Sequence, residues 1–184
     1  MALSDFQKRK LARMFAVMDA DGDGYVEIWD YTRRVDAVAR RYGWHKDGQQ
    51  YARNRRFAMM SWDALAESAD ADGDGRVSRD EFMRWAEIFL DDREAVRAYA
   101  RGDIQLLFDA MDTDGDGRIA EDEYRTYLEV CGVDTSYARE FFAYADLDEN
   151  GRIGRDEMSH AFEEFLLSTN PDAGGNYLFG PLES

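Results

Sequence analysis

Four short stretches of the chain carry acidic residues and glycine at the same spacing. Residues 19–30 read DADGDGYVEIWD, and the others are DADGDGRVSRDE at 70–81, DTDGDGRIAEDE at 112–123 and DLDENGRIGRDE at 146–157. Each has an oxygen donor at positions 1, 3 and 5, glycine at position 6, an aliphatic residue at position 8 and an acid at position 12. Carboxylates this close repel one another, so a folded loop of this kind needs a cation among them.

The spacing is that of the twelve-residue EF-hand loop, which binds Ca²⁺. Ca²⁺ takes about six to eight oxygens at ~2.3–2.6 Å, from the side chains at positions 1, 3, 5 and 12 and the backbone carbonyl of position 7. The residue type at position 7 is therefore free. The predicted ligands are Asp19, Asp21, Asp23, Tyr25 and Asp30 in loop one; Asp70, Asp72, Asp74, Arg76 and Glu81 in loop two; Asp112, Asp114, Asp116, Arg118 and Glu123 in loop three; and Asp146, Asp148, Asn150, Arg152 and Glu157 in loop four.

The segments around the loops must be helices if the loops are to be held in this way. A single acidic loop also occurs as a polar turn or in other calcium-binding folds, but these four copies have apolar residues at helical spacing beside them. Such sets are Leu11, Met14, Phe15 and Met18 before loop one, and Ile104, Leu107, Phe108 and Met111 before loop three. The repeated unit is therefore predicted to be helix–loop–helix.

Because a lone helix–loop–helix unit leaves an apolar face exposed, the units are expected to pair. Loops one and two should pair through short antiparallel strands centred on Val26 and Val77, and loops three and four through strands centred on Ile119 and Ile153. The predicted fold class is all-α, with four EF-hands in two pairs packed into a compact globule.

The spacing of the loops predicts the domain organisation. They begin at residues 19, 70, 112 and 146, so the spacing falls from 51 to 42 to 34 residues. The long first connection indicates a helix end at Gly43, a turn near 46–48 and a long helix that runs into Asp70. We expect an N-terminal pair at 1–92 with loops 19–30 and 70–81, a C-terminal pair at 93–168 with loops 112–123 and 146–157, and a tail at 169–184 packed on the core.

The unequal spacing, together with the apolar tail NPDAGGNYLFG at 170–180, resembles the calerythrin and sarcoplasmic calcium-binding protein family, particularly its bacterial members. The resemblance covers essentially the whole chain. It implies two EF-hand pairs packed face to face, with the tail tucked against the helices. It also implies aspartate at position 12 of loop one, as Asp30 is here. The second loop is often degenerate in that family, whereas loop two of this chain has a full set of ligands.

Asp30 is one methylene shorter than the glutamate at position 12 of the other loops. One hypothesis is that it binds through one oxygen or through water, which leaves a six-coordinate shell and a mixed Ca²⁺/Mg²⁺ site at loop 19–30. The alternative is that the loop contracts slightly and remains a calcium site.

Composition excludes several other functions. The formal charge of −16 and a pI near 4.5 argue against nucleic acid and anionic membranes as partners. His45 and His160 lie in no catalytic or zinc motif, so we expect no enzyme activity. Cys131 is the only cysteine, no apolar run is long enough for a membrane span, and the start MALSDFQKRK lacks the apolar centre of a secretory signal, so a cytoplasmic monomer is expected.

The segment 33–56 is locally basic. The arginines of 33–56 are interpreted as solvated charges that offset the acidic loops, with a docking surface for an acidic partner as the alternative.

The predicted activity is reversible binding of up to four Ca²⁺ ions as an intracellular buffer; the alternative is a sensor that opens an apolar groove and binds a target protein. Arginine far outnumbers lysine, which indicates a GC-rich, actinobacterial genome.

Overall fold

The structure is a computed structural model that describes residues 3–102 and 104–182. Helices make up most of these residues, as predicted for the fold class. In chain order the elements are α1 (Asp5–Met18), β1 (Tyr25–Val26), α2 (Ile28–Tyr42), α3 (Gln49–Ala69), β2 (Val77–Ser78), α4 (Arg79–Asp91), α5 (Arg93–Gly102), α6 (Ile104–Met111), α7 (Glu121–Val130), α8 (Ala138–Ala145), α9 (Arg155–Leu167) and the 3₁₀ helix η1 (Gly174–Tyr177).

Several helix ends follow from local sequence. Ser4 caps α1, since its hydroxyl accepts a hydrogen bond from the Gln7 backbone N–H (3.2 Å) while the Gln7 side chain accepts one from the Ser4 N–H (3.1 Å). Helix α2 ends at Gly43, whose φ of 68° is the left-handed conformation that glycine adopts without strain. Helix α3 runs to Asp70, its C-cap. The predicted turn and long helix between loops one and two are therefore confirmed.

Short antiparallel contacts join the loops in pairs. Strands β1 and β2 place Val26 opposite Val77. Ile119 and Ile153 form an isolated antiparallel bridge, with both backbone N–H to carbonyl distances at 2.9 Å. All four side chains have 0% exposure. The predicted pairing of loop one with loop two, and of loop three with loop four, is confirmed in register.

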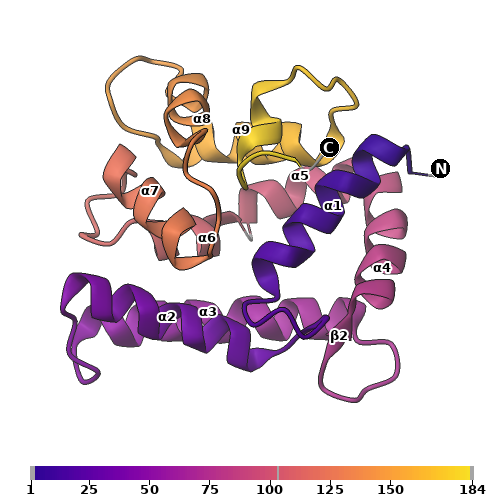
Figure 1. Cartoon of the computed structure of the whole chain (residues 1–184), viewed down its shortest axis with the longest axis horizontal. Helices are drawn as coiled ribbons and strands as arrows, with labels where there is room; N and C mark the ends of the chain where they lie inside the picture. The colour runs from indigo at the N-terminus through magenta and orange to yellow at the C-terminus, as the bar shows by residue number, and fades with distance from the viewer. Residues whose placement is uncertain (1–2, 103, 183–184) are drawn as a thin grey trace.

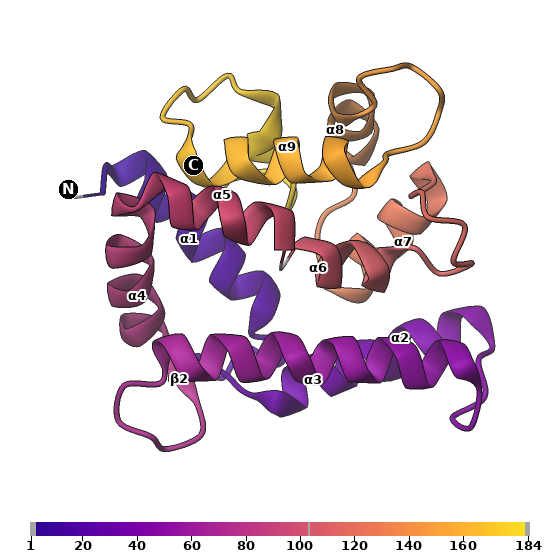
Figure 2. The ribbon, with the colours of Figure 1, turned by 180° about the vertical axis from the view of Figure 1, so that it is seen from behind.

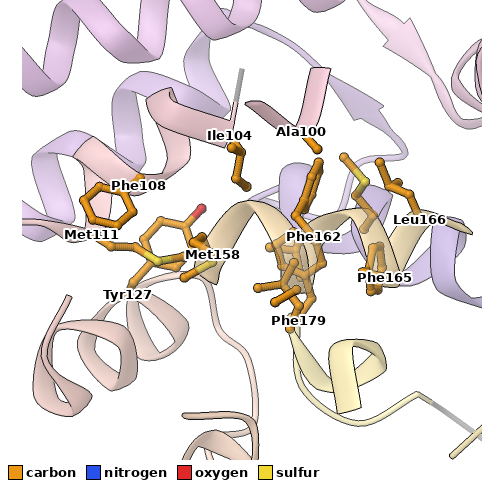
Figure 3. Packing of buried hydrophobic residues seen from close by; sticks show 14 of the residues in the cluster. Ala100, Ile104, Phe108, Met111, Tyr127, Met158, Phe162, Phe165, Leu166 and Phe179 are labelled. Atoms are coloured by element: carbon orange, nitrogen blue, oxygen red, sulfur yellow. The ribbon is translucent and has the colours of Figure 1, made fainter. Parts of the chain in front are cut away.

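The two halves of the chain share a continuous core. Helices α2 and α3 lie side by side along one edge of the molecule, and α8, α9 and the C-terminal segment lie along the opposite edge (Figures 1 and 2). Buried residues of α1 and α4 belong to the same hydrophobic cluster as those of α6 and α9. Figure 3 shows part of this cluster, with Met111 of α6 near Met158 of α9.

The C-terminal segment is packed into this core. Leu178 and Phe179 are buried, and the backbone around them is bound by side chains from two helices. Arg13 of α1 donates from Nε to the Phe179 carbonyl (2.8 Å), and the Tyr124 hydroxyl of α7 donates to the Leu178 carbonyl (2.8 Å). The tail therefore ties the first helix of the chain to the C-terminal half.

Among the described residues, no helix combines the length and the apolar character needed to cross a bilayer.

Candidate metal-binding sites

Each of the four acidic loops brings three carboxylates together. The acids at positions 1, 3 and 12 offer oxygen atoms that all lie within 4.8 Å of one another. The groups are Asp19, Asp21 and Asp30; Asp70, Asp72 and Glu81; Asp112, Asp114 and Glu123; and Asp146, Asp148 and Glu157. Opposite oxygens on one Ca²⁺ ion lie about 4.6–5.2 Å apart, twice the metal–oxygen distance, so each group fits around a single ion.

The helices on either side of a loop position these acids. In loops one, two and four, the acid at position 1 is the C-cap of the incoming helix. The acid at position 12 occupies the third position of the outgoing helix, where the positive end of the helix dipole favours negative charge. The loop must therefore fold back on itself to bring the two ends together.

Backbone N–H groups hold the carboxylate at position 1. In loop two, Asp70 accepts hydrogen bonds from Gly73 (2.8 Å) and from Gly75 at position 6 (3.0 Å), and the other loops repeat the bond from position 6. Position 4 has positive φ in every loop and is glycine in three of them; in loop four it is Glu149, with φ of 55°. Loop four therefore holds a non-glycine residue in a conformation that costs on the order of 1 kcal/mol.

Asp30 makes the same backbone contacts as the longer glutamates at position 12. One oxygen of Asp30 accepts from the Ala20 N–H (2.9 Å) and the other from the Glu27 N–H (2.8 Å). The corresponding bonds to Glu81 come from Ala71 and Ser78. Asp30 therefore occupies the same place in loop one as Glu81 does in loop two. How many oxygens Asp30 gives a metal, and so which of the two hypotheses holds, stays a prediction.

The surroundings of these acids shift their pKa values in different directions. Burial raises the pKa of Asp30 and the pKa of Asp112 above the ordinary value. In loop two the Ser78 hydroxyl and backbone N–H groups donate to Glu81 and lower its pKa to about 2. A divalent cation would offset the cost of the buried negative charge in loops one and three.

The acids at position 5 lie outside the three-acid groups. Asp23, Asp74 and Asp116 each accept a hydrogen bond from the backbone N–H two residues later, at 2.8–2.9 Å. The side chain at position 7 of loop two has contacts of its own, while the prediction that the backbone carbonyl of position 7 is the ligand stays a prediction. Arg76 forms an ion pair with Asp74 (3.1 Å), and its guanidinium carbon lies 4.3 Å from the ring centre of Tyr25, which is position 7 of the paired loop.

Two arginines near the sites were missed by the sequence interpretation. Arg53 of α3 donates to the Asp112 carbonyl (2.6 Å), and Arg34 of α2 donates to the Val17 carbonyl (2.7 Å). The expectation that the arginines of 33–56 are solvated is therefore wrong for these two, because the ends of α1 and α6 offer free carbonyls. Arg53 and Asp112 are 59 residues apart in sequence, so no local pattern predicts this contact.

The profile of the family described as "EF-hand domain pair" matches residues 8–87 and 103–163, which contain all four loops. A calcium-binding protein of Streptomyces coelicolor has a similar structure, with a TM-score of 0.73 and 28% identity over 87% of this chain and 97% of that chain. The sarcoplasmic calcium-binding protein of amphioxus gives a TM-score of 0.74 at 23% identity, over 98% of this chain and 99% of that one.

A coelenterazine-binding protein of Renilla muelleri gives a TM-score of 0.80 at 23% identity, over 98% of this chain and 100% of that one. At this identity, the amphioxus and Renilla structures show a shared fold alone. No curated protein matches the chain. The predicted resemblance to calerythrin and sarcoplasmic calcium-binding proteins is confirmed.

Proposed function

Because the chain belongs to the EF-hand domain pair family, we propose that it binds up to four Ca²⁺ ions reversibly, one in each acidic loop. The observation that carries the proposal is the gathering of carboxylates from positions 1, 3 and 12 within 4.8 Å in every loop. A shell of hard oxygen donors alone suits Ca²⁺, whereas zinc sites typically include histidine nitrogen or cysteine sulfur. The side chain at position 5 and the carbonyl at position 7 complete each shell.

Loop two is included as a Ca²⁺ site because its acids are arranged like those of the other three loops. Asp70, Asp72 and Glu81 are as closely gathered as the acids of the other loops. Hydrogen bonds from the backbone N–H groups of Ala71 and Ser78 hold the Glu81 carboxylate at the loop, as in the other loops. These features support a fourth Ca²⁺ site.

The role that the geometry supports best is a calcium buffer. The two EF-hand pairs contribute to one continuous core, so opening either pair to expose a groove would break contacts with the other. A buffer needs no such opening, because it acts by lowering the concentration of free Ca²⁺ and binds no target protein.

A second candidate role is a calcium sensor that binds a target protein. The structure of the Streptomyces coelicolor protein is described as a basis for prokaryotic calcium-mediated regulation, and that protein is 28% identical to this chain. A sensor would expose apolar surface when calcium binds and would engage a target through it.

Calorimetric titration of Ca²⁺ into the metal-free protein tests both the number of Ca²⁺ sites and the choice between buffer and sensor. We expect four sites in the wild type and three in Glu81→Gln, which keeps the shape of loop two and removes one charge. Dissociation constants near ~10⁻⁸ M that weaken at about 1 mM Mg²⁺ would support the buffer, and constants of about 10⁻⁶ M that ignore Mg²⁺ would support the sensor. Absence of any calcium-dependent heat would contradict the proposal.

A further inference from the structure

A pocket of about 240 Å³ lies among the helices of the two EF-hand pairs. Its wall is largely apolar and includes Met14 of α1, Phe82 and Trp85 of α4, Leu107 of α6 and Phe162 of α9. Figure 3 shows Phe162 beside Phe165 and Phe179 on the C-terminal side of the core. Ala64 and Ser68 of α3 line the same pocket and are exposed, so the pocket is accessible from solvent at α3.

Arg34 places a permanent positive charge in this apolar wall. Its Nη2 donates to the carbonyls of Val17 (2.7 Å) and Met18 (3.3 Å), while its buried Nε has no hydrogen-bond partner. None of the ion pairs formed by the described residues includes Arg34. Its guanidinium carbon lies 5.8 Å from the ring centre of Tyr31, and the charge of Asp30 in loop one acts on it without forming an ion pair. A partly desolvated cation with an unpaired N–H is unfavourable, so an anionic group in the pocket would be stabilised there.

The volume of the pocket decides what kind of partner it can hold. One turn of an α-helix about 10 Å wide and 5.4 Å long fills roughly 400 Å³, which exceeds this pocket. A cavity of about 150 Å³ holds a benzene molecule, so 240 Å³ accommodates a molecule with one or two aromatic rings. The size therefore favours a small molecule over the helix of a target protein.

We propose that this pocket binds a small planar aromatic molecule that carries a carboxylate or another acidic oxygen. The rings lie against Phe82, Trp85 and Phe162, and the acidic group pairs with Arg34. The residues that line this pocket lie outside the four acidic loops, and the inference does not depend on the affinity of the loops for calcium.

The test uses the full-length, calcium-saturated protein and two probes of the same shape, 2-naphthoate and the uncharged 2-naphthamide. Calorimetry should show saturable binding of 2-naphthoate at a single site. Arg34→Met should weaken 2-naphthoate by about tenfold to a hundredfold, because a hydrogen bond to a charged group is lost, and should leave 2-naphthamide within about threefold. Arg40→Met, an exposed arginine on the same helix, is the matched control and should change neither probe.

A second variant tests the location without altering the charge. Ala64→Phe at the solvent-exposed part of the pocket wall should block both probes, whereas Ala52→Phe, at an exposed alanine of the same helix outside the pocket, should not. Calcium titration and circular dichroism of each variant check that the fold is retained. No saturable binding of 2-naphthoate, unchanged binding in Ala64→Phe, or equal losses for both probes in Arg34→Met would overturn the proposal.

Discussion

Position 12 of loop one holds an aspartate where the other three loops hold glutamate, and the difference should set the ion preference of that loop. In Asp30→Glu, the second carboxylate oxygen can reach the ion and raise the coordination number, which Mg²⁺ accepts less well than Ca²⁺. We expect Mg²⁺ affinity at loop one to fall on the order of tenfold. Competition titrations of Ca²⁺ against Mg²⁺ would measure the change.

The reverse substitution at loop two provides the control for this prediction. Glu81→Asp shortens the acid that occupies the same position in the paired loop. We expect it to increase competition by Mg²⁺ at loop two while leaving loop one as in the wild type. Unchanged competition in Asp30→Glu would show that the loop contracts around Asp30 and selects calcium as the other loops do.

At the scale of residues, sequence spacing predicted which acids lie together in each loop. It did not predict which distant side chains contact the loops. Asp19, Asp21 and Asp30 gather because the loop length and the glycine positions bring positions 1, 3 and 12 together. Arg53 reaches loop three from α3 because of tertiary packing, across 59 residues of sequence. Local periodicity carries no information about contacts at that separation.

At the scale of elements, the bridge between loops three and four should support both loops. Ile119 is fully buried on this bridge, and Ile119→Ala should lower the free energy of unfolding by about 2–5 kcal/mol. Ile88→Ala is the control, because Ile88 is 76% exposed and its truncation should stay within about 0.5 kcal/mol. Urea denaturation of the calcium-saturated proteins would compare them. Equal effects of the two substitutions would contradict the structural role of the bridge.

The contact between α1 and the segment after α9 should make stability depend on pH. Lys10 of α1 is 1% exposed and donates to the Ser168 carbonyl (2.6 Å), and burial lowers its pKa from 10.5 to about 8, with Glu164 opposing the shift. Between these two values the unfolded chain still binds the proton that the folded chain has lost. The contribution of Lys10 to stability should therefore rise with pH over this window, by at most about 3 kcal/mol, and should be lowest below pH 8.

Comparison with Lys10→Met isolates this contribution from the other titrating groups. The variant has no proton to lose at this position, so the difference in unfolding free energy between wild type and variant should change from about pH 8 to about pH 10. Urea denaturation at several pH values would measure it. A difference that stays constant over the window would rule out Lys10 as the source.

At the scale of the whole molecule, the repeats and their pairing could be predicted from the sequence, but the pocket between the two EF-hand pairs could not. The bridge between Val26 and Val77 follows from a repeated pattern with one aliphatic residue per loop. The pocket at Arg34 and Trp85 depends on how α1 to α4 pack against the C-terminal helices. Apolar residues at helical spacing occur both in a filled core and around a pocket, so their pattern could not distinguish the two.

The distribution of charge over the molecule leads to the last prediction, which concerns metal removal. The four loops contain 21 of the 39 aspartate and glutamate residues, and four divalent ions would offset half of the formal charge of −16. A site saturated at about 1,000 times its dissociation constant adds about 4 kcal/mol of stability, so four sites together would match or exceed the 5–15 kcal/mol typical of a whole domain. Chelation should therefore lower the thermal midpoint by at least about 20 °C.

Chelation lowers the midpoint through two effects: the free energy of Ca²⁺ binding is lost, and the unmetallated acids repel one another. Added salt distinguishes these effects. If repulsion among the unmetallated acids destabilises the metal-free chain, about 0.5 M KCl should raise its midpoint, because the screening length falls to a few ångströms. The calcium-saturated protein should respond less, since the ions already neutralise the loops. Calorimetric scans with chelator, with and without salt, would measure both effects. A midpoint unchanged by chelator would show that the continuous core folds the chain without metal.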